Sequence, residues 1–167
     1  IFLIFYDLIP LINPKQYLNN NPSFKRFYLE KVKELKCVNY LLAISQSSTD
    51  EAIRYLKWDS NCIKNISSAC DQSLFTLPQN FNVEKYIDGS YILYSGAGDP
   101  RKNLPRLIAA YASLPIQIIN ENKLVLVGKL YPPEISAINE QVKKYNLTSD
   151  RIIILGYVSD QNLVNLY

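Results

Sequence analysis

The stretch YSGAGDPRKNLPRL, residues 94–107, joins an apolar run to a helical pattern through a loop with two glycines and two adjacent cations. The run at 91–95 is of the kind found in buried strands. After the loop, apolar residues recur at helical spacing at Leu104, Leu107, Ile108 and Tyr111. The order strand, loop, helix predicts a parallel α/β unit, with the loop at the carboxyl end of its strand, where such folds bind ligands.

The loop does not match either common phosphate-binding motif. A dinucleotide fingerprint that begins at Gly96 needs a third glycine at the position of Arg101. A Walker loop needs that same glycine and a Ser or Thr in place of Asn103, although its lysine is present as Lys102. Both motifs are therefore excluded by their spacing.

Pro105 indicates where the following helix begins. Proline costs about 3 kcal/mol in a helix interior but little in the first turn, so we expect Asn103 to be the N-cap. The loop then spans 96–102, and the helix amino end adds free N–H groups to its glycine backbone. Together with the charges of Arg101 and Lys102, this stretch favours an anion, and phosphate above all. The alternative interpretation is a solvated Arg-Lys pair in a surface turn.

The alternation of apolar runs and helical patterns occurs in both halves of the chain. The expected parallel strands are residues 1–6, 40–44, 62–66, 91–95, 123–127 and 152–155, the first of them covered on both faces. Residues 76–90 break this pattern with proline, asparagine and glycine and are the expected linker. Two β-α-β-α-β domains result, at 1–75 and 91–167.

Several helices are expected to begin at polar capping residues. In the first half, after a polar loop, the candidates are Ser23 for one helix and Ser48 or Thr49 for the next. The second of these helices would carry Asp50 and Glu51 in its first turn, where carboxylates suit the helix dipole. In the second half, Ser159 with Asp160 is expected to cap the last helix.

Composition excludes several kinds of site. The chain has 167 residues and a net charge of +3 with scattered cations, so we expect no nucleic-acid partner. It has no histidine, which excludes Ser-His-Asp triads, Cys-His pairs and His-ligated metals from this piece.

The three cysteines lack C-x-x-C spacing and are expected to be buried, reduced thiols. No apolar run is long enough to span a membrane. The absence of methionine, position 1 included, predicts a piece of a longer protein that is cut at both ends.

Longer segments resemble family 4 glycosyltransferases, which are retaining enzymes of the GT-B fold. YILYSGAGDPRKNLPRLIAAYASLP, KLVLVGK and DRIIILGYVSDQNLVNLY resemble the nucleotide-binding domain of that family. FYDLIPL, YLLAISQSSTDEAIRYL and IKNISSACD resemble the end of its acceptor domain, and all six pieces have the family's order and spacing. The resemblance implies two Rossmann-like domains, each incomplete here. The early glycine-rich loop and the later E-x7-E segment are absent, so the fragment alone is expected to be inactive.

The resemblance also implies roles for particular residues. Lys102 would bind the diphosphate, and Asp7, at the carboxyl end of the first strand, would face the sugar or acceptor. These two are the candidate catalytic residues, although Asp7 could simply cap the loop that follows it. The residues expected to bind the donor nucleotide are Gly96, Gly98, Arg101, Lys102, Asn103, Gly156, Tyr157 and Val158.

Two positions depart from the family pattern. Many members have an arginine where Ala97 stands, a charge that Arg101 would supply here. Many also have a histidine where Tyr6 stands. These departures favour an alternative function, a non-catalytic module that binds a nucleotide or sugar. A different GT-B enzyme, such as a nucleotide-sugar epimerase, is a third interpretation.

The activity that the resemblance implies is transfer of a sugar, with retention, from a nucleotide-diphosphate sugar to a glycan or lipid-linked acceptor. No cofactor is expected, and no metal, because the sequence contains no Asp-x-Asp pair. The setting typical of bacterial relatives is cell-surface polysaccharide synthesis. Because no membrane span is found in this piece, we expect a cytoplasmic enzyme that can rest on the inner face of the membrane.

Overall fold

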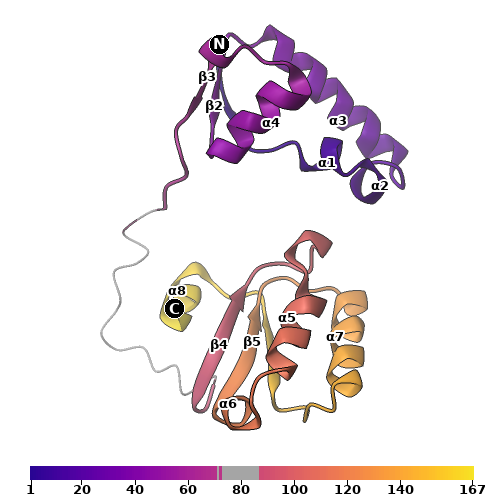
Figure 1. The fold of residues 1–167 in the computed structure, drawn as a ribbon, viewed down its shortest axis with the longest axis vertical. Helices are drawn as coiled ribbons and strands as arrows, with labels where there is room; N and C mark the ends of the chain where they lie inside the picture. Colours follow the sequence, from indigo (N-terminus) through magenta and orange to yellow (C-terminus); the bar gives the residue numbers. More distant parts are fainter. Residues whose placement is uncertain (71, 73–86) are drawn as a thin grey trace. The chain divides into compact units, whose positions relative to one another are not determined.

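The computed structural model describes residues 1–70, 72 and 87–167, which belong to two compact units, residues 1–70 and 71–167. Each unit holds one three-stranded sheet whose strands all run parallel. The predicted α/β fold class, with two β-α-β-α-β units, is therefore confirmed. Most of the predicted linker at 76–90 lies outside the described residues. Figure 1 shows the two units.

The sheet of the first unit has the strand order β1-β2-β3. Leu3 pairs with Leu41, and Leu41 pairs in turn with Ile63, so β2 is the central strand. The elements of this unit are β1 (Phe2–Phe5), α1 (Ile9–Ile12), α2 (Pro14–Tyr17), α3 (Pro22–Glu34), η1 (Leu35–Cys37), β2 (Tyr40–Ala43), α4 (Gln46–Leu56), η2 (Ser60–Cys62) and β3 (Ile63–Asn65). The short helices α1 and α2 occupy what was expected to be an irregular polar loop.

The described residues cover only one face of this sheet. Phe5 and Leu41 are buried on that face, in one cluster with Ala52 of α4. Side chains of a strand alternate between faces, and on the other face Phe2 and Ile4 are 72% and 56% exposed. The prediction that the first strand is covered on both faces is therefore wrong for the described chain.

Two helices begin earlier than predicted. The Asn21 side chain, not Ser23, caps α3 by accepting from the Phe24 N–H, because Pro22 suits the first helical position. Ser45 caps α4 by accepting from the Ser48 N–H, so Ser48 lies inside the first turn. Neither acidic residue at 50 and 51 lies in the first turn of that helix, contrary to expectation.

The prediction of buried thiols is also wrong for two of the three cysteines. Cys37 ends the short helix η1 and Cys70 lies beyond β3, and both are exposed because neither belongs to a hydrophobic core cluster, while Cys62 is partly exposed. All three are free thiols.

The sheet of the second unit has the strand order β4-β5-β6, with helices on both faces (Figure 1). Its elements are β4 (Ser90–Ser95), η5 (Pro100–Lys102), α5 (Leu104–Ala112), α6 (Ile116–Glu121), β5 (Asn122–Val127), α7 (Pro132–Lys144), β6 (Ile152–Gly156) and α8 (Asp160–Leu166). Ser159 caps α8 by accepting from the Asn162 N–H, as predicted.

The central strand β5 explains why both faces are covered. Leu124 and Leu126 point into the cluster that α5, α6 and α7 form with the sheet. Val125 and Val127 point the other way, into the cluster that holds Leu166 of α8. All four side chains are at most 4% exposed, so this strand is buried on both sides and fixes the sheet edge from which the loops emerge.

Candidate functional site

Glycines form the carboxyl edge of the second sheet. Gly96 directly follows β4, Gly128 directly follows β5, and Gly156 ends β6. The Gly96 N–H donates to the Val127 carbonyl at 2.8 Å, and the Gly128 N–H donates to the Gly156 carbonyl at 2.8 Å. The edge therefore presents glycine backbone at three neighbouring strand ends, where Gly96 and Gly128 permit close packing within the protein and Gly156 leaves open space beside it.

Gly128 is the most constrained of these positions. Its φ is +136°, and a Cβ built there would lie 2.0 Å from the Gly96 carbonyl oxygen. The loop after β4 thus rests directly on the backbone of the loop after β5. Gly128 directly follows the strand expected at 123–127, but no local pattern in the sequence indicated this contact.

Other contacts hold the glycine loop from its two sides. The Tyr94 hydroxyl donates to the Ala97 carbonyl at 2.9 Å. A Cβ at Gly98 would lie 2.6 Å from Cγ of Glu134, in the first turn of α7. Gly98 is therefore needed for packing against α7, in addition to its predicted place in the binding loop.

Asp99 organises the part of the loop that carries the cations. Its Oδ1 accepts from the Arg101 N–H at 3.0 Å, its Oδ2 lies 3.1 Å from Arg101 Nε, and its carbonyl accepts from the Lys102 N–H at 2.9 Å. Sequence reasoning did not single out this residue, although an Asp before a proline turn is a signal for such a local bond. Arg101 is thus held by its own loop, and the exposed Lys102 side chain has no ionic partner among the described residues.

Asn103 occupies the predicted N-cap position of α5 but does not cap with its side chain. The η5 turn runs straight into the helix, and the Asn103 N–H donates to the Pro100 carbonyl, which places Asn103 at φ 53°. Asparagine tolerates this left-handed conformation well. The expected free N–H groups are also fewer, because Pro105 has none and the Arg106 N–H bonds to Asn103.

Three loop donors nevertheless remain available to a ligand. No described residue accepts a hydrogen bond from the backbone N–H of Ala97, Gly98 or Leu104. The first two of these N–H groups lie at the start of the loop, and the third belongs to the first residue of α5. Together with Lys102 they make the loop suited to an anion.

The loop after β6 holds the residues expected to bind the base. Gly156 has φ +71° with no atom within 4 Å of a built Cβ, so the space beside it is open. Tyr157 is 79% exposed, whereas Val158 packs against the cluster that includes Leu166. Tyr157 is therefore the side chain of this loop that solvent or a ligand can reach.

Asp7 lies in the first unit, just after β1, and is partly exposed. Its Oδ1 accepts from the Ile9 N–H at 3.1 Å, so Asp7 bonds the backbone of the segment that follows it, although the N-cap of α1 is Leu8. Two residues of α4 bond the backbone next to it: Glu51 Oε2 accepts from the Leu8 N–H at 3.0 Å, and the Ser48 hydroxyl donates to the Tyr6 carbonyl.

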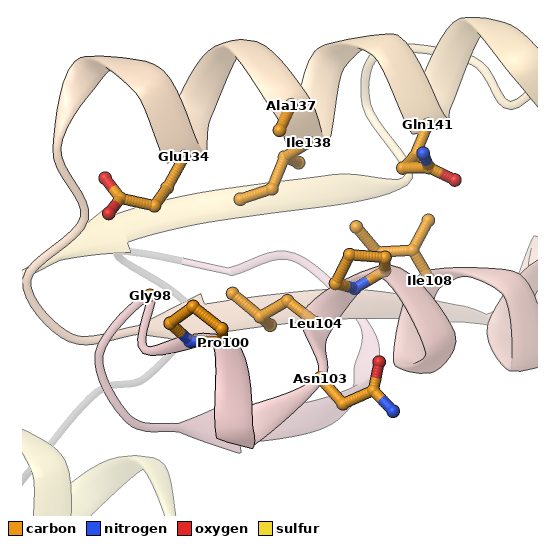
Figure 2. Close-up of a pocket in the computed structure, with 10 residues that line it drawn as sticks. Gly98, Pro100, Asn103, Leu104, Ile108, Glu134, Ala137, Ile138 and Gln141 are labelled. Atoms are coloured by element: carbon orange, nitrogen blue, oxygen red, sulfur yellow. The ribbon is translucent and has the colours of Figure 1, made fainter. Parts of the chain in front are cut away.

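A pocket of about 250 Å³ lies between α5 and α7 beside the glycine loop (Figure 2). Gly98, Pro100 and Glu134 flank one end, and Gln141 lies toward the other. Most of the lining is apolar, and Lys102 does not contribute to it. The described residues contain no group of three His, Cys, Asp or Glu side chains placed to bind a metal, and none of their helices is long and apolar enough to cross a membrane.

Two solved structures share this fold. The crystal structure of Anabaena Alr3699/HepE in complex with UDP and glucose aligns with 95% of this chain and 42% of its own, at a TM-score of 0.70 and 19% identity. The structure of WaaG, a glycosyltransferase involved in lipopolysaccharide biosynthesis, aligns with 98% of this chain and 47% of its own, at a TM-score of 0.68 and 14% identity. The two parallel sheets therefore belong to the GT-B fold, of which this chain holds a part.

Characterised relatives are similar over nearly the whole chain. The serotype-specific mannosyltransferase WbdA of Escherichia coli is 32% identical over 97% of this chain, which spans only 20% of WbdA. The O-antigen chain mannosyltransferase B of Escherichia coli is 28% identical over 98% of this chain, which spans 43% of that protein. A family model described as glycosyl transferases group 1 matches residues 78–167, more than half of the sequence, and the chain therefore belongs to the glycosyl transferases group 1 family.

Proposed function

We propose that the complete protein is a retaining, family 4 glycosyltransferase that moves a hexosyl group from a nucleotide-diphosphate sugar to a glycan or lipid-linked acceptor. The mannosyltransferase relatives support mannose as the sugar, and their O-antigen role supports cell-surface polysaccharide synthesis as the setting. Such an enzyme works in the cytoplasm and can rest on the inner face of the membrane. Its partners are the sugar nucleotide and the acceptor, not nucleic acid.

The observation that carries this proposal is the side-chain-free edge at Gly96, Gly128 and Gly156, with Lys102 and unpaired N–H groups beside it. During transfer the bond from the anomeric carbon to the donor phosphate oxygen breaks. A bond from that carbon to an acceptor oxygen forms on the same face of the sugar, and the hydroxyl proton leaves with the nucleoside diphosphate. Negative charge therefore grows on the leaving phosphate.

Lys102 and the loop amides stabilise that charge more in the transition state than in the ground state, which is what accelerates a reaction. Because Asp99 holds Arg101, we assign the direct diphosphate contact to Lys102, with Arg101 adding positive potential nearby. This arrangement supplies positive charge from the protein itself, and we propose that no metal takes part. Gly156, Tyr157 and Val158 contact the base, and Asp7 contacts the sugar or acceptor.

The experiment that tests the proposal is transfer by the complete protein from GDP-mannose or UDP-glucose to a lipid-linked glycan acceptor, with the product anomer determined by NMR. We expect a product whose anomeric configuration matches that of the donor. An inverted product would contradict retention. Tight binding of a sugar nucleotide without any transfer would instead support the non-catalytic module, which the replacement of the usual residues by Ala97 and Tyr6 favours.

Asp99 offers a matched pair of variants. Asp99→Asn keeps an oxygen that can accept from the Arg101 N–H but removes the ion pair, whereas Asp99→Ala removes both. We expect Asp99→Ala to weaken nucleoside diphosphate binding about fivefold, because the turn that carries Lys102 loses a bond worth about 1 kcal/mol and becomes less ordered. Asp99→Asn is expected to bind within about threefold of the wild type, because the exposed ion pair contributes about 0–1 kcal/mol. Calorimetric titration measures both, and equal losses would contradict this role of the Asp99 oxygen.

A further inference from the structure

We propose that Ser48 and Glu51 of α4 are positioning residues that hold Asp7 in place by bonding the backbone on either side of it. The inference rests on the proposed contact between Asp7 and the sugar or acceptor. The two residues are called the α4 clamp below. Asp7 itself keeps the role of a residue that touches substrate, and the clamp acts only through it.

The clamp reaches both neighbours of Asp7. The Ser48 hydroxyl donates to the Tyr6 carbonyl, and Glu51 Oε2 accepts from the Leu8 N–H at 3.0 Å. Ser48 and Glu51 are three residues apart on a helix, so their side chains emerge on the same side. The segment from Tyr6 to Leu8 is thus bonded at its first and last residue by one rigid element more than 40 positions away in sequence.

Ser48 is fixed by a short chain of hydroxyl groups. It is 5% exposed, its N–H donates to Ser45 Oγ at 3.0 Å, and the two Oγ atoms are also 3.0 Å apart. Because a serine hydroxyl has one proton and that of Ser48 goes to Tyr6, Ser45 must donate to Ser48. The N-cap residue Ser45 is therefore linked through the Ser48 hydroxyl to the Tyr6 carbonyl by successive hydrogen bonds.

Two negative charges, those of Asp7 and Glu51, lie near the Tyr28 hydroxyl. The Tyr28 hydroxyl of α3 is buried, and no described residue makes a hydrogen bond of good geometry with it. Burial, followed by the negative charge of Asp7 and to a smaller extent that of Glu51, raises the pKa of Tyr28, while the Leu11 backbone opposes the shift. The carboxylates of Asp7 and Glu51 thus share one environment, where Glu51 is anchored by the Leu8 N–H and Asp7 by the Ile9 N–H.

This segment needs such support because β1 is an edge strand of the sheet. Only β2 pairs with it among the described residues, and its register ends with Phe5 opposite Ala43, before Asp7 is reached. A displacement of about 1 Å at a substrate-contacting group can cost about 10²-fold in rate. The α4 clamp is the contact that prevents such a displacement.

The test uses the complete protein with four substitutions. Glu51→Ala removes the acceptor for Leu8, Glu51→Gln keeps an oxygen that can accept, and Asp7→Asn removes only the charge of Asp7. Asp50→Ala is the matched control, because Asp50 is an acid on the same helix that bonds Gln46 instead. The rate of sugar transfer gives kcat and KM, and amide hydrogen exchange at Leu8 reports the clamp directly.

We expect Glu51→Ala to lower kcat about 10–100-fold and to speed exchange at Leu8 at least tenfold, with the donor KM within about twofold of the wild type. Glu51→Gln and Asp50→Ala are expected to stay within about threefold of the wild-type rate. In the Asp7→Asn background, Glu51→Ala is expected to cost less than about twofold more, because the group that the clamp positions has already lost its charge.

The outcomes separate the clamp from the proposed function. If Asp7→Asn lowers activity but Glu51→Ala changes neither kcat nor exchange at Leu8, the clamp is overturned alone. Equal losses in Glu51→Gln and Glu51→Ala would also overturn it, because the charge of Glu51 would then act on the substrate itself. Full activity of Asp7→Asn, or no sugar transfer by the wild type, would overturn the role of Asp7 and the clamp with it.

Discussion

Replacement of Lys102 by alanine is expected to lower the rate of sugar transfer by the complete protein about 10²–10³-fold. The lysine lies at the end of the loop 96–102, which has few backbone N–H groups without an acceptor, and its neighbour Arg101 is held by Asp99. Removal of Lys102 therefore takes away the cation that is placed to meet charge on the leaving diphosphate. The loss is expected mainly in kcat, because the charge on the leaving group grows as the bond breaks.

Steady-state transfer rates at saturating sugar nucleotide measure this effect. The matched control is Lys143→Ala, which removes the same charge from the last turn of α7, at the other end of that helix from the loop that follows β5. We expect the control to keep the wild-type rate within about twofold, as is usual for exposed surface positions. Equal rates for Lys102→Ala and the wild type would contradict the catalytic assignment of Lys102.

Replacement of Gly128 by alanine is expected to destabilise the second unit by more than about 3 kcal/mol. The new Cβ would lie 2.0 Å from the Gly96 carbonyl oxygen and 2.6 Å from its carbonyl carbon, and both are backbone atoms that cannot rotate away. The φ of +136° adds strain for any residue with a side chain. The loops after β4 and β5 must then separate, which breaks the hydrogen bond from the Gly96 N–H to the Val127 carbonyl.

Amide hydrogen exchange in β5 is the suitable measurement, because the one tryptophan of this sequence, Trp58, lies in the first unit and does not report on the second. The control is Gly89→Ala, where φ is also positive, at +83°, but no atom lies within 4 Å of the built Cβ. That variant is expected to cost only the conformational penalty of about 1–2 kcal/mol. Similar losses of protection in the two variants would show that close contact at Gly128 is not the cause.

The sheet architecture could be predicted because each buried parallel strand is a short, continuous apolar run in the sequence. Each of the six apolar runs became a strand, and each end of every strand lies within one residue of its predicted position. Helix starts were harder to place because several polar residues compete for the same role. Asn21 and Ser23 both suit a cap, and only Pro22 between them decides for Asn21.

The site was predictable where a residue acts through its position along the chain and not where it acts through distant contacts. The place of Lys102 between a strand and a helix was correct. The contacts of Gly128 with Gly96, and of Glu51 with Leu8, join segments that lie 32 and 43 positions apart. No local pattern encodes such pairs, because they depend on how strands and helices pack.

The most direct test of the diphosphate site at this sheet edge is a map of sugar-nucleotide binding on the complete protein. Amide hydrogen exchange is compared with and without saturating GDP-mannose or UDP-glucose, in the wild type and in Lys102→Ala. We predict slower exchange in residues 96–104 and 156–158 of the wild type, and little slowing in the variant. Binding that protects neither segment, or that protects both equally in Lys102→Ala, would contradict the assignment of this edge as the diphosphate site.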